Sequence, residues 1–143
     1  MPKVECSIVI DQPIEKVFTY TTTPSNYINW QPWILDSQAE RRISTGTRIE
    51  VISQFMGRKL DMTTQVVEYV PSKRLVAQGV PGSFFKHLVY RFEPEGESTK
   101  VTYIVEYQPR GLLQMLGPLT VSRFQREVED SLRNLKGVLE ADY

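Results

Sequence analysis

The chain has 143 residues, of which 41% are apolar, and its 17 lysines and arginines equal its 17 aspartates and glutamates in number. A chain of this length fits one domain around one hydrophobic core, so we expect residues 1–143 to form a single domain. Because the net charge is zero and no long basic run is present, the composition argues against nucleic acid as a partner, and no apolar run approaches the roughly 20 residues of a transmembrane segment.

The first predicted element is a strand over residues 4–11, where apolar and polar side chains alternate. Its inward face is expected to carry Val4, Cys6, Ile8 and Ile10. The period then changes, and Pro13 suits the first turn of a helix. The apolar stripe of this helix consists of Ile14, Val17 and Phe18.

A second short helix is predicted between Ser25 and Pro32, within the segment PSNYINWQPWI. This segment holds both tryptophans of the chain and a tyrosine, namely Tyr27, Trp30 and Trp33. Because prolines bound the segment, it cannot form a long element, yet its aromatic side chains bury much surface. We therefore expect it to lie against an apolar surface and to close one end of the interior.

From about residue 36 to residue 108 the period of two returns, and turn signals divide this part into strands at roughly 36–43, 47–55, 59–69, 75–79, 83–92 and 100–108. The short turns favour an antiparallel meander. Alternation predicts an inward face with Ile49, Val51, Ser53, Phe55, Phe84, Leu88, Tyr90, Phe92, Val101, Tyr103, Val105 and Tyr107. In the strand 59–69 the inward set is either Leu60, Met62, Thr64 and Val66 or Thr63, Gln65, Val67 and Tyr69.

The last predicted element is an amphipathic helix of about six turns, preceded by a shorter helical piece around Leu112 to Leu116. Its apolar stripe consists of Val121, Phe124, Val128, Leu132, Leu135 and Leu139. A single helix cannot cover a flat sheet of this breadth, so the simplest packing curls the sheet around the helix. The predicted fold class is α+β, with a seven-stranded antiparallel curved sheet wrapped around a long C-terminal helix and two short helices between strands one and two.

This order of elements, with DQPIEKVF after the first strand, VVEYVPSKRL, YRFEP and STKVTY among the later ones, resembles the START-like helix-grip superfamily (SRPBCC) and, within it, the polyketide cyclase/dehydrase-like group. The resemblance covers essentially the whole chain. It implies a cavity between sheet and helix for a lipid, polyketide, isoprenoid or similar hydrophobic small molecule. A filled core made of the same residues is the alternative interpretation.

The ligand-binding residues expected from this interpretation are Tyr27, Trp30, Trp33, Phe55, Met62, Phe84, Leu88, Tyr90, Tyr103, Leu113, Phe124 and Val128. No catalytic residue, metal site or cofactor is expected, because the single histidine, His87, alternates toward the outer face and Cys6 has no partner for a metal. Lys86 could pair with a ligand carboxylate or reach the rim, and Arg110 could meet an anionic group at the mouth.

Three functions remain open on the sequence: a carrier or sensor of a hydrophobic ligand, which we favour, a polyketide cyclase or dehydratase, and a protein-interaction domain with a filled core. An enzyme would need a positioned acid–base pair inside the cavity, and none is evident. The single cysteine and the absence of a long apolar run at the N-terminus lead us to expect a cytoplasmic protein. The sequence does not determine the oligomeric state.

Overall fold

The structure, a computed structural model, describes residues 2–109, 112–115 and 117–141, and for residues 112 and 113 only the backbone. Its strands are β1 (Lys3–Ile10), β2 (Ile34–Ala39), β3 (Arg48–Phe55), β4 (Arg58–Asp61), β5 (Thr64–Val70), β6 (Arg74–Gly79), β7 (Phe85–Glu95) and β8 (Ser98–Tyr107). Its helices are α1 (Ile14–Thr21), the 3-10 turn η1 (Pro24–Asn26), α2 (Tyr27–Trp30), α3 (Leu112–Met115) and α4 (Pro118–Glu140).

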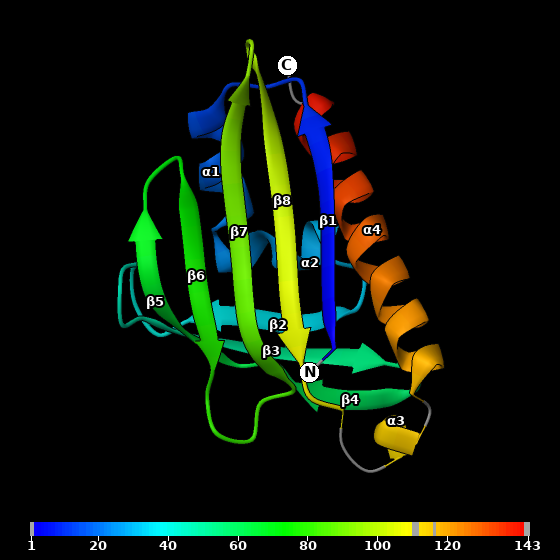
Figure 1. Ribbon diagram of the computed structural model, residues 1–143. Coiled ribbons are helices and arrows are strands. Elements are labelled where there is room, and N and C mark those ends of the chain that lie inside the picture. The colour runs from blue at the N-terminus through cyan, green and yellow to red at the C-terminus, as the bar shows by residue number, and fades with distance from the viewer. Residues whose placement is uncertain (1, 110–111, 116, 142–143) are drawn as a thin grey trace.

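The sheet is antiparallel and its strands follow the order β1-β8-β7-β6-β5-β3-β2, with β4 paired to β3 outside this path. In Figure 1 the strands β1, β8, β7, β6 and β5 stand upright while β2, β3 and β4 run across behind them, so the sheet curls into a half-barrel. Helix α4 runs along β1, and α1 and α2 lie on the same concave side. The predicted fold class is therefore confirmed, including the short helices between β1 and β2.

Alternation along the strands places the side chains as expected where the pairing is regular. Strand β3 alternates strictly, with Ile49, Val51, Ser53 and Phe55 buried and the residues between them exposed. Strand β8 buries Val101, Tyr103, Val105 and Tyr107 toward the same interior. A period of two is sufficient for these faces because the bulges opposite them place the extra residue in β2 and β7, and not in β3 or β8.

The predicted strand 59–69 is two strands, because β4 pairs with one end of β3 and β5 pairs with its other end and with β6. Met62, Thr64 and Val66 are buried, as the first of the two alternatives states. A bulge between Val66 and Glu68 then reverses the parity. Tyr69 consequently reaches Phe18 of α1, with ring centroids 5.6 Å apart. Each alternative is thus correct for one part of the segment.

The predicted strand 36–43 is shorter in the structure, because β2 ends at Ala39. The Thr47 side chain closes the following turn by donating to the Arg42 carbonyl oxygen and accepting from the Ser44 amide. These side chain–backbone hydrogen bonds take the place of the backbone hydrogen bonds to β3 that a longer β2 would form.

Helix α4 buries Phe124, Val128, Leu132, Leu135 and Leu139, as the predicted stripe requires. Val121 is an exception, because it is 36% exposed and Thr120 is buried instead. Residues four apart follow one face of a helix, so Thr120 lies below Phe124 whereas Val121 turns to the side. None of the described helices is long and apolar enough to cross a membrane.

Candidate functional site

Six aromatic side chains from different parts of the chain meet over the first turns of α4, and we name them the phenyl cluster: Trp33, Phe55, Phe84, Phe85, Tyr107 and Phe124. Phe124 is its centre. Its ring stacks on Tyr107 with centroids 4.2 Å apart and on Phe84 with centroids 5.8 Å apart. Trp33 meets the same ring edge-on at 4.8 Å. Strands, a loop and a helix therefore all contribute one apolar surface.

A second group lies deeper in the interior and is polar at its centre, where Gln31 is only 1% exposed. The Gln31 side chain accepts a hydrogen bond from the Tyr103 hydroxyl at 3.0 Å and donates one to the Tyr90 hydroxyl at 3.2 Å. Trp33 Nε1 donates to the same Gln31 oxygen at 3.4 Å, a long bond. Tyr27 and Trp30 pack their rings against Tyr90. We call these five residues, Tyr27, Trp30, Gln31, Tyr90 and Tyr103, the glutamine cluster.

Several buried polar atoms have no hydrogen-bond partner among the described residues. They are Thr21 Oγ1, Tyr27 Oη, Trp30 Nε1, Ser53 Oγ and Tyr107 Oη. Tyr90 lies close enough to the Tyr27 hydroxyl to raise the pKa of Tyr27, but no hydrogen bond of normal geometry joins the two hydroxyl groups. A buried polar group without a partner costs about 1–3 kcal/mol. These atoms are therefore available to a polar group or a water molecule that enters the interior.

The interior tyrosines remain neutral at physiological pH. Burial raises the pKa of Tyr27, Tyr90 and Tyr103 well above its ordinary value, and it raises the pKa of Tyr107 to about 12. A neutral hydroxyl can donate or accept a hydrogen bond but is a poor base. In the described part of the chain, no carboxylate, lysine, arginine or histidine side chain is buried. The described interior thus favours binding over proton transfer.

An open hollow of about 390 Å³ leads toward the phenyl cluster between the loop before β2 and α4, and we call it the mouth. Its lining consists of Pro32, Trp33, Leu35, Gln54, Glu127 and Asp130. Burial, followed by the neighbouring charge of Asp130, raises the pKa of Glu127. Glu127 is partly buried and follows Arg123 by four residues along α4. Trp33 is the one residue that belongs both to the mouth and to the phenyl cluster.

The structure gathers the predicted ligand-binding residues in the interior. Those buried there are Tyr27, Trp30, Trp33, Phe55, Met62, Phe84, Leu88, Tyr90, Tyr103, Phe124 and Val128. The side chain of Leu113 lies outside the described residues, as does Arg110. Tyr90, Tyr103 and Phe124 do not line the mouth or the three other described surface hollows. Ligand contact by the predicted residues stays a prediction.

Sequence reasoning missed Gln31 and Phe85. Gln31 stands between Trp30 and Pro32, and a polar residue inside a strongly apolar segment is the signal that could have identified it. Alternation leaves Phe85 off the inward face, but a bulge between Phe85 and His87 changes the parity there. Phe84 and Phe85 are therefore both buried, at 6% and 4% exposure.

The other candidates lie away from the interior. Lys86 occupies that bulge and is only partly buried, and His87 is likewise half-exposed. Cys6 accepts a hydrogen bond from Gln125 of α4, and burial raises its pKa to about 11. A thiol with so high a pKa is a weak nucleophile near neutral pH. The described residues contain no group of three or more potential metal ligands.

A family model described as "Polyketide cyclase / dehydrase and lipid transport" matches residues 1–140. The chain is similar to the solved structure of TTHA0849 from Thermus thermophilus, with 23% identity, a TM-score of 0.85 and coverage of 99% of this chain and 100% of the other. A START superfamily protein from Mycobacterium smegmatis has 18% identity, a TM-score of 0.78 and 97% coverage of both chains.

The Zhui aromatase/cyclase from Streptomyces sp. R1128 has 11% identity and a TM-score of 0.76, with coverage of 96% of this chain and 93% of the other. At these identities the three structures establish the fold. No curated protein matches the chain.

Proposed function

The chain belongs to the polyketide cyclase/dehydrase and lipid transport family, and from that premise we propose that it binds a hydrophobic small molecule, such as a lipid, polyketide or isoprenoid, between the sheet and α4. In this proposal residues 1–143 act as one ligand-binding domain, a carrier or sensor. The observation that carries the proposal is an aromatic interior that contains buried polar atoms without partners among the described residues.

The interior offers such a ligand two kinds of contact, apolar ring surfaces and unpaired hydroxyl groups. The phenyl cluster offers flat apolar surfaces, which suit a ring system or an acyl chain. Tyr107 Oη and Ser53 Oγ are buried without a partner in the described part of the chain and can hydrogen-bond to an oxygen of the ligand. In a solid core, unpaired polar atoms of this kind are rare because each one is destabilising. A ligand that satisfies them would recover that free energy on binding.

Entry requires an aromatic side chain to move, because the described interior is closely filled by these rings. Trp33 is the best candidate for this movement. It stands in the loop between α2 and β2 and borders the mouth, and among the described residues its indole N–H donates across a long bond of 3.4 Å to Gln31. The proposed ligand displaces Trp33 and takes its place against Phe124, which selects a conformation with an open mouth.

The favoured function is a carrier or sensor and not a cyclase, because the described interior offers neutral tyrosine hydroxyls and a glutamine instead of an acid–base pair. Catalysis of a cyclisation would require a proton acceptor at the reacting carbon. A screen with polyketide-like substrates that gives no turnover, combined with saturable binding, is the result expected here.

The proposal is tested by titrating the protein with N-phenyl-1-naphthylamine, an uncharged apolar fluorophore. We expect saturable binding of one probe per chain, with quenching of tryptophan emission from Trp30 or Trp33. Native mass spectrometry of the purified protein is expected to reveal a reproducible co-purifying mass. Absence of saturable probe binding, together with absence of a co-purifying mass, would indicate a filled core and favour an interaction domain.

Variants of the mouth separate entry from affinity. Trp33→Leu keeps the site apolar but replaces the large indole ring at the mouth with a smaller side chain. We therefore expect the probe to associate roughly tenfold faster, because the barrier to opening the mouth is lower. Ile28→Ala is the matched control, because Ile28 is 54% exposed on the neighbouring helix α2 and does not border the mouth. Equal association rates in the two variants would argue against Trp33 as the gate.

A further inference from the structure

The net charge of zero conceals an uneven distribution along the molecule. The turn between β7 and β8, together with the ends of β1 and α4, carries exposed acidic residues, namely Asp11, Glu95, Glu97 and Glu140, of which Glu140 forms an ion pair with Lys136. Figure 1 places these segments together at one end of the molecule. The opposite end carries α3, the first turns of α4 and the turn between β3 and β4.

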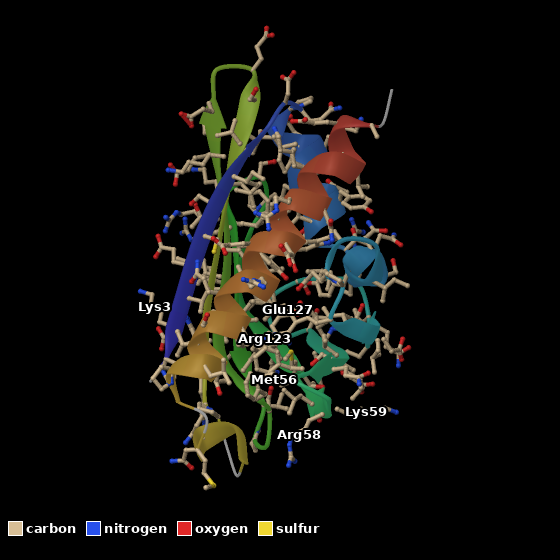
Figure 2. All side chains as sticks on the ribbon, turned by 90° about the vertical axis from the view of Figure 1, so that its right-hand side faces the viewer. Lys3, Met56, Arg58, Lys59, Arg123 and Glu127 are labelled. Atoms are coloured by element: carbon tan, nitrogen blue, oxygen red, sulfur yellow. The ribbon has the colours of Figure 1, made fainter. Side chains whose placement is uncertain are left out.

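That opposite end is both basic and apolar, and we define the α3 end by Met115, Leu119, Arg58, Lys59 and Arg123. Met115 is 83% exposed and Leu119 is 52% exposed, although both are large apolar side chains. Arg58, Lys59 and Arg123 are exposed, and no ion pair joins any of them to a described residue. Figure 2 shows Arg58 pointing away from the body of the protein in this half of the molecule.

Carboxylates near the α3 end are few and partly engaged. Asp61 accepts a hydrogen bond from the Thr63 amide at 2.8 Å. Glu106 lies directly across from Lys3 in the pairing of β1 with β8. Glu127 faces Arg123, whose charge lowers the pKa of Glu127 against the larger opposing effect of burial. Arg58 and Lys59 are the first two residues of β4, directly after the β3–β4 turn, and neither forms an ion pair with a described residue.

We propose that the α3 end docks on a lipid bilayer that contains anionic lipids. Lysine and arginine side chains near such a surface are attracted to its negative charge. Exposed methionine and leucine side chains can enter the boundary between headgroups and acyl chains. The acidic opposite end is repelled by the same surface, so the charge distribution also selects the orientation of the protein.

The docked orientation gives the proposed ligand a short path. Gln54, which lines the mouth, lies two residues before Met56 and four residues before Arg58 in the chain. A hydrophobic molecule could therefore pass between the bilayer and the mouth with little exposure to water. The docking proposal adds a source for the ligand, but it concerns a different surface from the interior and is measured separately.

The test is co-sedimentation of the full chain with vesicles of phosphatidylcholine, with and without phosphatidylglycerol. We expect binding only to the anionic vesicles, weakened by added salt because screening shortens the range of the attraction. The double variant Arg58→Glu with Lys59→Glu is expected to lose at least about tenfold in vesicle binding. Arg42→Glu with Lys73→Glu is the matched control, because these two cations are exposed, lie outside the α3 end and form no ion pair with a described residue.

A second pair of substitutions tests the apolar contribution without changing charge. Met115→Ser with Leu119→Ser is expected to weaken binding to anionic vesicles severalfold. Ile28→Ser on α2 is the control, because Ile28 is 54% exposed and Leu119 is 52% exposed. Equal binding to neutral vesicles, equal loss in both charge variants, or retention on heparin with no vesicle binding would overturn the docking proposal. Binding of the apolar probe without vesicles reports on the interior alone, so the two proposals fail independently.

Discussion

The rings of Tyr107 on β8 and Phe124 on α4 stack with centroids 4.2 Å apart and planes 13° apart, while the Tyr107 hydroxyl is buried and has no partner among the described residues. The ring of Tyr107 therefore stabilises the interior as an apolar surface, and its hydroxyl does not. The hydroxyl groups of the interior tyrosines therefore contribute differently to the free energy of unfolding.

Tyr107→Phe removes an unpaired buried polar atom, so it is expected to leave the free energy of unfolding unchanged or to increase it by at most about 3 kcal/mol. Tyr103→Phe is the matched comparison and is expected to cost about 1 kcal/mol, because Tyr103 donates to Gln31. Urea denaturation monitored by circular dichroism checks both values. A larger loss for Tyr107→Phe than for Tyr103→Phe would contradict the assignment.

Gly79 is expected to tolerate no side chain. A Cβ atom at this position would lie 1.7 Å from the carbonyl oxygen of Phe85, which is backbone and cannot move aside cheaply. Gly79→Ala should therefore destabilise the fold by more than about 2 kcal/mol and disturb the bulge that turns Phe85 inward. Gly137→Ala is the control, because nothing lies within 4 Å of its added Cβ in α4. That change should stabilise the helix by about 0.5–1 kcal/mol.

Stability should fall at alkaline pH. The folded-state pKa of Tyr27, Tyr90, Tyr103 and Tyr107 is raised above the ordinary value of 10.0, so the unfolded chain releases protons first as pH rises. The contribution of these groups is complete below the unfolded pKa of about 10 and is lost as pH rises toward the folded values. Urea midpoints measured from neutral pH to about pH 11 should decrease only in the alkaline part of this range. Phenolate absorbance that develops fully while the fold is intact would contradict these burials.

Cys6 should react slowly despite its partial exposure. With its pKa raised to about 11 by burial and then by the charge of Glu129, little thiolate is present near neutral pH. A higher pKa also makes the remaining thiolate more nucleophilic, so the net decrease should be about tenfold relative to an ordinary cysteine. Alkylation by iodoacetamide, followed by mass spectrometry with and without urea, measures this ratio. Equal rates in the folded and unfolded protein would show that the site does not suppress ionisation.

The stripe on α4 and the alternation on β3 and β8 were predictable because both depend on local periods. A helix places residues three and four apart on one side, and a strand places every second residue on one side. Phe124, Tyr103 and Ser53 therefore take their inward positions from the pattern of neighbouring residues alone. The segment around Trp30 was predictable for a different reason, since closely spaced aromatic residues between prolines must be buried by packing.

Long-range contacts decided the rest of the site. The partners of Gln31 are Tyr90 and Tyr103, which are 59 and 72 residues away in the chain, so the local pattern could mark Gln31 as unusual but could not assign its partners. The bulges beside Val66 and Phe85 also depend on the partner strand, because one extra residue on one side of a ladder is defined only by the pairing.

The sequence by itself determined the α+β class, the element order and most inward faces, because burial of apolar side chains imposes periods of two and 3.6 residues on the chain. The tertiary structure alone decided that Phe85 joins Phe84 against Phe124 and that Trp33 borders the mouth. It also decided that Tyr107 and Ser53 are buried without partners among the described residues. Each of these outcomes depends on which distant side chains share the same space, and a one-dimensional pattern contains no information on that competition.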